Sequence, residues 1–300
     1  EMMNFPGVAS GDPQMLAEIA ATRAAGKTVG GHYASPDLGR PFHAYVAGGA
    51  NDDHETTTEA QGIARVRQGM GCMMRLGSAW YDVATQITAI TEKGLDPRFF
   101  ILCTDDSHSG TLVHDGHMNR VVRHAIDCGC DPLVAIQMAT LNAAQHFGLE
   151  RELGSITPGR CADLILTSDL ATLPIEAVIA QGQLVAEHGR LLVDCPRIDW
   201  PDSARQSVHL GKVLTASDFQ AHAPGDTARV RVIGVVENQA PTRALSAELP
   251  VRDGVIEAQG DTCHIALVER HRATGGVVNG FVSGFGYLAG TAVASTVAHD

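Results

Sequence analysis

Metal-binding side chains follow three short apolar runs in the first half of the chain. His32 follows residues 27–31, His54 lies in the segment "GGANDDHETTTEA" after another short run, and the pair Asp105 and Asp106 follows residues 99–103. In a parallel β/α protein the functional side chains lie where the strands end, so these separated residues are expected to converge at one rim. Imidazole nitrogen with carboxylate oxygen suits zinc, manganese or iron better than calcium. The pattern predicts hydrolytic metal chemistry, with Glu1, at what reads as the tail of a strand, as a further ligand.

Polar residues beside these positions are candidates for supporting roles. Glu55 follows His54 directly and is expected to orient its ring, although a carboxylate at the start of a helix is the alternative. Arg75, Ser78 and His108 lie at expected strand exits and are candidate substrate contacts. The structural alternatives are that Arg75 pairs with a carboxylate and that Ser78 caps the next helix.

Alternating apolar runs and helical periods up to about residue 150 indicate β/α units around a parallel sheet. Helices are expected at 12–25, 59–68, 83–93, 115–129 and 131–148, the last as one continuous helix. Residues 27–31 are expected to form a strand, and Asp52 and Asp53 to be solvated turn residues. His114, His117 and His124 are expected along one helix, with His117 and His124 too far apart for a shared metal.

Five strand exits are visible, at Glu1, His32, His54, Arg75 and Asp105, whereas a closed parallel barrel has eight strands. Unless the sheet is open, about three β/α units should precede Glu1, and both ends of the sequence read as cut. We therefore expect the isolated segment to be inactive.

The pattern changes after residue 150. Gly/Pro turns, β-branched residues and short alternation predict a small antiparallel layer over 151–196. A connecting stretch up to about residue 228 and then an α+β unit are expected within 197–300.

The composition excludes several classes of protein. The chain has 300 residues, 44% of them hydrophobic, and a formal charge of -12, without a Lys/Arg-rich run, so no nucleic-acid partner is expected. No apolar run reaches the roughly 20 residues of a membrane span, so no membrane partner is expected. Seven cysteines without a Cys-x-x-Cys pair are expected to be reduced, in a cytoplasmic protein.

Several motifs carry a family resemblance. The run "GSITPGRCADL" at 154–164, after "MATLNAA", resembles the point at which amidohydrolases leave the barrel for a β-sandwich. The ordered series "MNFPGV", "GGH", "DDHETTTEA", "MMRLGSA", "CTDDSHSGTLVHDGHMNRVVRHAI" and "LVERHRATGG" resembles the bacterial adenine deaminase family within that superfamily. The resemblance implies an α/β fold with the C-terminal part of a TIM-type (β/α)8 barrel over 1–150, a β-sandwich portion over 151–196 and the family's C-terminal domain over 197–300.

The resemblance also implies an activity and a ligand set. The reaction would be metal-dependent hydrolysis of adenine to hypoxanthine and ammonia, in purine salvage. Glu1 matches the carboxylate that bridges two metals, His32 the fifth-strand ligand, His54 the sixth-strand ligand and Asp105 the eighth-strand carboxylate. Two ions of manganese or iron are implied, and the ligand types also suit zinc.

In this chemistry Asp105 would take the proton of the attacking water and pass it on. Asp106 would hydrogen-bond an N–H of the purine, but spacing alone does not decide which of Asp105 and Asp106 faces the metal. The alternatives are another amidohydrolase, such as an N-acetylglucosamine-phosphate deacetylase, or a non-catalytic assembly subunit. A homo-oligomer is expected.

Overall fold

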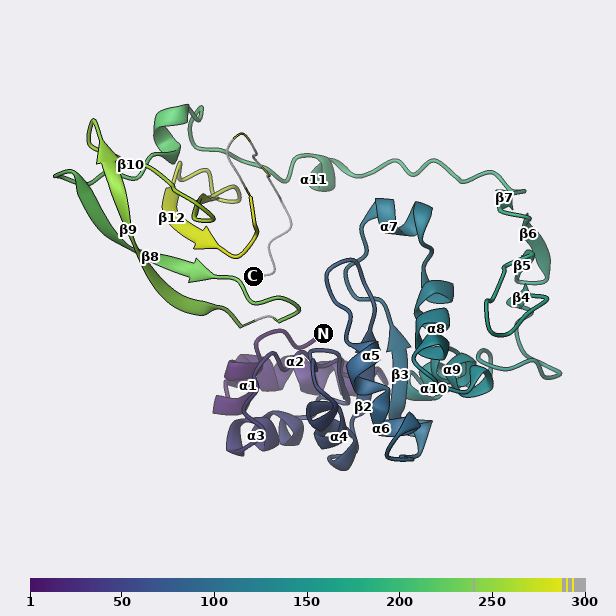
Figure 1. Cartoon of the computed structure of the whole chain (residues 1–300). Helices are drawn as coiled ribbons and strands as arrows, with labels where there is room; N and C mark the ends of the chain where they lie inside the picture. The colour runs from purple at the N-terminus through teal and green to yellow at the C-terminus, as the bar shows by residue number, and fades with distance from the viewer. Residues whose placement is uncertain (240, 288–289, 291–292, 294–300) are drawn as a thin grey trace. The chain divides into compact units, whose positions relative to one another are not determined.

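The computed structural model of the chain describes residues 1–239, 241–287, 290 and 293. It divides into two compact units, Glu1–Cys195 and Pro196–Asp300, which are described separately below (Figure 1). The end of the C-terminal domain expected over 197–300 includes residues outside the described part, namely 288–289, 291–292 and 294–300.

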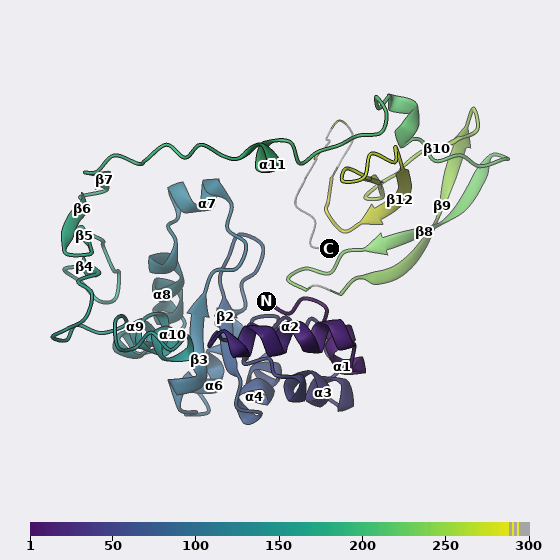
Figure 2. The ribbon, with the colours of Figure 1, turned by 180° about the vertical axis from the view of Figure 1, so that it is seen from behind.

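The first unit is built around parallel chain segments. The strands β1 (Asp52–Asp53), β2 (Gly71–Arg75) and β3 (Phe100–Cys103) form a parallel sheet in that order (Figures 1 and 2). On the β1 side, Asn51 N donates to Val29 O over 2.8 Å, and Met2 forms a parallel bridge with Gly31. Five segments therefore run in sequence order and end near the residues expected at strand exits.

The prediction of a strand over residues 27–31 was wrong, apart from the single bridge at Gly31. Side chains take the place of the usual ladder here. Val29 N donates to Asn51 Oδ1 over 3.1 Å, and Gly31 N donates to Asp52 Oδ1 over 2.9 Å. The segment is thus held in a strand-like position by polar side chains of its neighbour rather than by that neighbour's carbonyl groups.

Helices surround these segments, and several begin at the caps that the sequence predicts. The Asp12 side chain accepts from the amides of Gln14 and Met15, and Asp131 accepts from Leu133 and Val134. Each cap is followed by proline, which suits the first helical turn because it has no amide hydrogen to leave unpaired. The helical elements are α1 Phe5–Ser10, α2 Pro13–Ala24, α3 Arg40–Gly48, α4 Glu59–Arg67, α5 Val83–Gln86, α6 Thr88–Thr91, η1 Pro97–Phe99, α7 Ser109–His114, α8 Met118–Asp127, α9 Pro132–Ala139 and α10 Leu141–His146.

Two expected helices are broken. The helix over residues 83–93 divides into α5 and α6 around Ile87, and the Thr88 hydroxyl bonds the carbonyl of Thr85 and the carboxylate of Glu59. The helix over residues 131–148 breaks at Thr140, whose hydroxyl donates to Ile136 O over 2.7 Å. In both places a threonine side chain competes for the backbone bonds that would continue the helix.

The single helix expected to carry three histidines is also two helices. Gly116, with φ 109°, lies between α7 and α8. His114 therefore ends α7, His117 caps α8, and only His124 lies inside α8.

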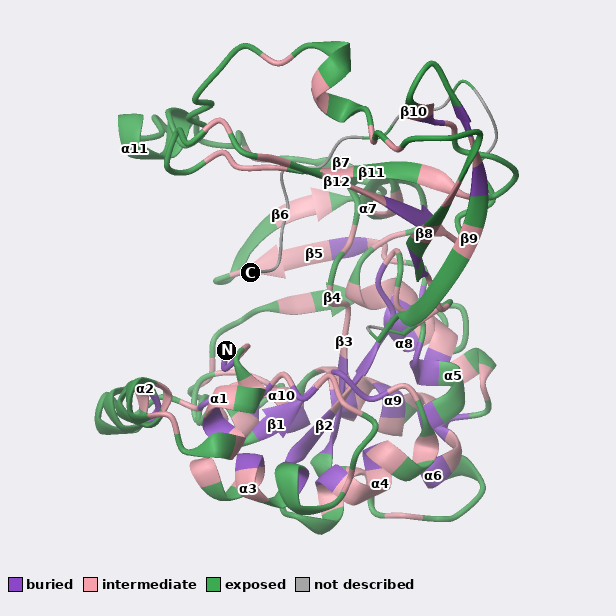
Figure 3. Ribbon diagram, turned by 90° about the vertical axis from the view of Figure 1, so that its left-hand side faces the viewer, coloured by how far each residue is buried: buried purple, intermediate pink, exposed green. Residues whose placement is uncertain are grey.

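The core of the first unit consists of two apolar clusters. One gathers around β2 and β3 with α8 and α9 and includes Met74, Phe100 and Met138, while the other lies under α1–α3 and includes Tyr33, Phe42 and Tyr45. In Figure 3 the buried colour runs along β1 and β2, whereas α2 is mostly exposed. Burial of the strands fixes the position of the residues that directly follow them.

An antiparallel sheet occurs where the sequence predicts one. Its strands are β4 (Leu164–Leu166), β5 (Ala177–Ala180), β6 (Gln183–Glu187) and β7 (Arg190–Leu191), paired in that order. Leu173, between β4 and β5, is part of the apolar cluster around β2 and β3.

The described residues of the second unit form a five-stranded sheet. In spatial order its strands are β10 (Val255–Ile256), β9 (Arg243–Arg252), β8 (Thr227–Gly234), β12 (Val277–Ser283) and β11 (Cys263–Val268). β12 pairs with β8 in parallel, and the other pairs are antiparallel. The described helical elements of this unit are the short α11 (Asp202–Arg205) and η2 (Ala216–Phe219). No described helix of the chain is long and apolar enough to cross a membrane.

Candidate metal centre

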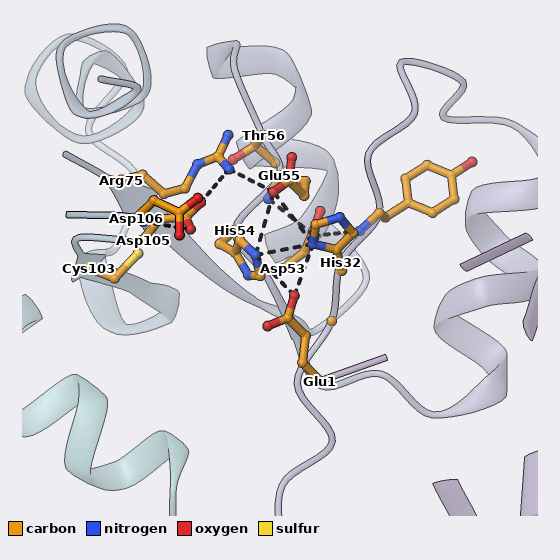
Figure 4. Close-up of polar contacts among 12 residues, drawn as sticks. Glu1, His32, Asp53, His54, Glu55, Thr56, Arg75, Cys103, Asp105 and Asp106 are labelled. Atoms are coloured by element: carbon orange, nitrogen blue, oxygen red, sulfur yellow. Dashed lines mark hydrogen bonds and ion pairs between the residues drawn. The ribbon is translucent and has the colours of Figure 1, made fainter. Parts of the chain in front are cut away.

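Four side chains converge where the first three parallel segments end (Figure 4). His32 Nδ1 and His54 Nε2 face each other at 3.3 Å. Glu1 Oε1 lies 3.0 Å from His32 Nδ1 and 3.4 Å from His54 Nε2. Glu55 Oε1 lies 3.5 Å from each of the two nitrogens. Residues far apart in the sequence thus bring two imidazole nitrogens together, with an oxygen of Glu1 and an oxygen of Glu55 each close to both nitrogens.

The donor atoms fit a bound cation in both spacing and chemistry. Ligand atoms around one tetrahedral ion with bonds of about 2.0–2.1 Å lie about 3.3–3.4 Å apart. The distances from Glu1 and Glu55 to the two histidine nitrogens, and between those nitrogens, are 3.0 to 3.5 Å and fall around that value. Two imidazoles and two carboxylates suit zinc, iron or manganese.

The electrostatics of the cluster also favour positive charge. Burial would lower the pKa of His32, but the hydrogen bond to Glu1 and the charge of Glu55 outweigh it, so its pKa is raised. The pKa of Glu1 is lowered, chiefly by its hydrogen bond to His32. Burial raises the pKa of Glu55, against the opposing charge of Arg75. The cluster therefore binds a proton more tightly than an isolated imidazole does, as expected of a site with excess negative charge.

Buried side chains position the backbone beside both histidines. His32 N donates to the hydroxyl of Tyr45 over 2.7 Å, and that hydroxyl lies 3.2 Å from the carbonyl of Met2. The carboxylate of Asp53 accepts from Tyr33 N over 2.8 Å and from Arg65 Nε and Nη2 over 2.7 Å each. Because Tyr33 and Asp53 are the immediate neighbours of the two histidines, these bonds set the relative position of the ligands.

Glu55 and Asp105 are linked through Arg75. Nη1 of Arg75 donates to Glu55 Oε1 and to Asp105 Oδ2 over 2.7 Å each, while its Nε donates to Asp82 over 2.8 Å. The side chain is fully buried and lies over the ring of Trp80, 4.3 Å from the centroid. From the sequence, Arg75 is a candidate substrate contact, with pairing to a carboxylate as the alternative. The structure shows the alternative, because the side chain pairs with three carboxylates.

Asp105 lies near the histidines without joining all four donors. His54, Glu55 and Asp105 each offer one ligand atom, and these three atoms lie within 4.8 Å of one another. Glu1, His32 and His54 form another such group. Asp105 has a left-handed backbone, with φ 59°, and its Oδ1 accepts from Asp106 N over 2.8 Å. Left-handed residues other than glycine are uncommon and concentrate at functional sites.

The remaining candidates lie on the adjoining loops. Asp106 and His108 are exposed and are outside both metal-binding groups of the described residues. The Ser78 hydroxyl accepts from His108 N over 2.8 Å and lies 2.7 Å from the hydroxyl of Thr111. Ser78 thus ties the loop after β2 to the start of α7 and does not cap α5, the next helix, whose N-cap is Asp82.

The expectation that Asp52 and Asp53 are solvated was wrong. Both are buried, with relative exposures of 2% and 0%. Asp53 is paired with Arg65, and Asp52 lies 2.6 Å from His146 Nε2 on α10. Buried carboxylates need such partners because an unpaired one would carry a large desolvation cost.

Sequence reasoning missed the residues that support the site, above all Tyr45, Arg65 and Asp82. Arg65 could not be identified from the sequence, because its burial with Gly62 on one face of α4 is known only from the structure. Tyr45 could not be identified because α3 was not predicted.

Both units of the chain match known protein families. The profile described as "Amidohydrolase family" matches residues 1–185, and that described as "Adenine deaminase C-terminal domain" matches residues 239–300. Proteins named adenine deaminase from Paracoccus denitrificans (strain Pd 1222) and Ruegeria sp. (strain TM1040) are 86% and 74% identical to the chain, over 300 and 302 residues. Each alignment covers 100% of this chain and 50% of the relative, so the chain spans about half the length of these relatives.

Among solved structures, a beta-aspartyl dipeptidase from Fervidobacterium islandicum AW-1 matches with a TM-score of 0.46 and 16% identity, covering 64% of this chain and 55% of that one. The first unit combines parallel strands, surrounding helices and acid and histidine side chains at the strand ends, and the family profile covers nearly all of it. With the matched residues 1–185 making up more than half of its length, this chain belongs to the amidohydrolase family and has that family's α/β fold.

Proposed function

We propose that this chain is the part of an adenine deaminase that contributes Glu1, His32, His54 and Asp105 to a metal centre for hydrolysing adenine to hypoxanthine and ammonia. The observation that carries the proposal is the convergence of Glu1, His32 and His54, whose ligand atoms lie 3.0–3.4 Å apart at the ends of parallel segments, beside Asp105, which forms a second group with His54 and Glu55. The relatives named adenine deaminase and the match to the C-terminal domain of that name supply the substrate. Neither points to a deacetylase of N-acetylglucosamine phosphate.

The reaction replaces the amino group on C6 of adenine by oxygen from water and releases ammonia. A divalent ion held by Glu1, His32 and His54 would lower the pKa of water towards about 7 and so supply hydroxide near neutral pH. The chain's own carboxylates must then transfer a proton, since water has to lose one and the departing amine has to gain one.

Asp105 is suited to accept and return the proton. Its Oδ2 is held by Arg75 Nη1 over 2.7 Å, which fixes the direction of the carboxylate. Its Oδ1 is held by the amide of Asp106, which restricts rotation of the carboxylate. Glu55, with one oxygen near both histidines and the same oxygen on Arg75, orients the imidazoles.

Asp106, His108 and Ser78 form the proposed purine-binding side of the site. Asp106 and His108 are exposed on the loop between β3 and α7 and offer an acceptor and an imidazole to the ring nitrogens. Ser78 holds this loop in place through His108 N. In this proposal Arg75 acts on the carboxylates instead of on the purine.

We also propose a domain arrangement, a metal content and an oligomeric state. Residues 1–150 would be the C-terminal part of a TIM-type barrel, 151–196 a β-sandwich portion, and 197–300 part of the adenine-deaminase C-terminal domain. The metal centre would hold two manganese or iron ions, with zinc as the alternative. The protein would be a homo-oligomer that acts in purine salvage in the cytoplasm.

A test uses the full-length protein, stripped with a chelator and reloaded with Mn²⁺. Adenine should be converted to hypoxanthine with one ammonia per turnover, and His54→Ala should abolish this. Arg98→Lys, in an exposed pair with Asp96, is the matched control and should keep wild-type activity. Release of acetate from N-acetylglucosamine 6-phosphate would support the deacetylase instead, and absence of both metal binding and turnover would support a non-catalytic subunit.

A further inference from the structure

Arg75 makes an unusual set of contacts for a buried arginine. Its side chain has no exposed surface, yet it meets three carboxylates, those of Asp82, Glu55 and Asp105. Two of these contacts use the same nitrogen, Nη1, while Nη2 is buried and has no hydrogen-bond partner within the described residues. The position that places Nη1 between two acids leaves Nη2 without a hydrogen bond to the described residues.

We infer that Arg75 is a positioning residue whose Nη1 atom fixes Glu55 and Asp105 relative to the histidines, and that Asp82 acts on the site through it. The inference rests on the proposed function for its catalytic consequence, but its effect on metal binding is independent of the substrate.

The geometry supports a shared anchor. The oxygen of Glu55 that accepts from Nη1 is the same oxygen that lies 3.5 Å from His32 Nδ1 and from His54 Nε2. Asp105 Oδ2 lies on the other side of that nitrogen, also at 2.7 Å. Moving Nη1 would therefore displace acids that come from two different strand exits, those after β1 and after β3.

Asp82 and Trp80 hold the guanidinium from outside the metal-binding groups. Asp82 is fully buried at the start of α5 and accepts from Nε over 2.8 Å, and Asp82 N donates to the carbonyl of Arg75 over 2.8 Å. Trp80 covers the face of the guanidinium. An arginine suits this task because its planar fork fixes two directions at once, whereas a lysine ammonium is a single compact donor group on a flexible four-carbon stem.

The experiment compares Arg75→Lys and Asp82→Asn with wild type in the full-length protein, with Arg98→Lys as the matched control. Arg75→Lys keeps the charge and removes the fork. Asp82→Asn keeps the shape and leaves Glu55, Asp105 and the histidines unchanged. For each variant the measurements are thermal unfolding, the Kd of Mn²⁺ for stripped protein by calorimetry, and kcat and KM for adenine.

We expect both variants to weaken Mn²⁺ binding by roughly tenfold, the size of effect found when partners of metal ligands are altered. We also expect kcat to fall by roughly tenfold or more with KM changed less than threefold, and Asp82→Glu to recover part of the loss. If Arg75→Lys does not fold, Asp82→Asn alone decides.

Wild-type Kd and kcat in folded Asp82→Asn would overturn the inference, as would equal losses in Arg98→Lys. If wild type binds Mn²⁺ but does not deaminate adenine, the proposed function fails, while a weaker Kd in the two variants would still support the positioning role.

Discussion

Replacing Arg65 by methionine tests how much the first unit depends on the buried pair beside the histidines. Arg65 and Asp53 are both fully buried, and two nitrogens of Arg65 lie 2.7 Å from the same carboxylate oxygen. The variant keeps an apolar stem of similar length against Phe42 but leaves Asp53 with a buried charge. Breaking such a pair from one side costs about 3–5 kcal/mol.

Asp53 would retain the amides of Tyr33 and Glu55 as donors, so we expect the lower end, about 3 kcal/mol. For a domain of this size that corresponds to a fall in Tm of about 6–12 °C. The assay is thermal and urea unfolding followed by circular dichroism. Arg98→Met, at an exposed pair, should leave the midpoint unchanged.

A second variant separates lost charge balance from lost packing. Adding Asp53→Asn to Arg65→Met removes the stranded charge but keeps an acceptor for the two amides, so at least about half of the lost stability should return. The reasoning is refuted if Arg65→Met lies within about 1 kcal/mol of wild type, or if the double variant is no more stable than the single one.

The other predictions concern the ligands, a close backbone contact and a loop. His54→Ala removes a ring nitrogen from the cluster and should weaken Mn²⁺ binding by more than about a hundredfold in calorimetry, exceeding the effect of altering a ligand's partner; a change under tenfold would contradict the assignment. A Cβ on Gly31 would lie 1.9 Å from Asp52 O, so Gly31→Ala should destabilise the unit by about 3 kcal/mol or more in urea unfolding. Gly110→Ala, where no atom lies within 4 Å of the added Cβ, should not, and equal behaviour of the two would argue against the contact. The pKa of Glu269 is lowered to about 2, and the largest cause is the hydrogen bond from the amide of Thr274. The stability that this carboxylate contributes is therefore complete above pH 4.5, its ordinary pKa, and is lost as the pH falls through about 2. A carboxyl NMR titration with a midpoint near 4.5 would contradict this.

Some of the strands that precede the candidate metal-binding side chains could be predicted from the sequence because they depend on local patterns. Strands β2 and β3 lie where apolar runs predict them, and Asp105 follows β3, whereas residues 27–31 before His32 contain only a single bridge. The same holds for the helices that begin at Asp12 and Asp131, because an acid followed by proline suits a helix start in any tertiary context.

What could not be predicted depends on contacts between distant residues. In the sequence Asp52 and Asp53 resemble turn residues. Only the structure shows that His146 pairs with Asp52 and Arg65 with Asp53. The break at Thr140 places Asn142 so that its amide donates to the carbonyls of Pro97 and Phe100, a contact with a segment more than forty positions earlier (45 and 42 residues). Helical periodicity carries no record of such contacts.

The backbone of Asp105 restricts which acid this strand exit can use. Its φ of 59° favours glycine, asparagine and aspartate, and of these only aspartate offers a carboxylate. Glutamate could supply the charge but would carry the strain of a left-handed backbone, roughly 1–2 kcal/mol. A change of acid during evolution or in protein engineering would therefore weaken the turn between β3 and α7 as well as lengthen the side chain.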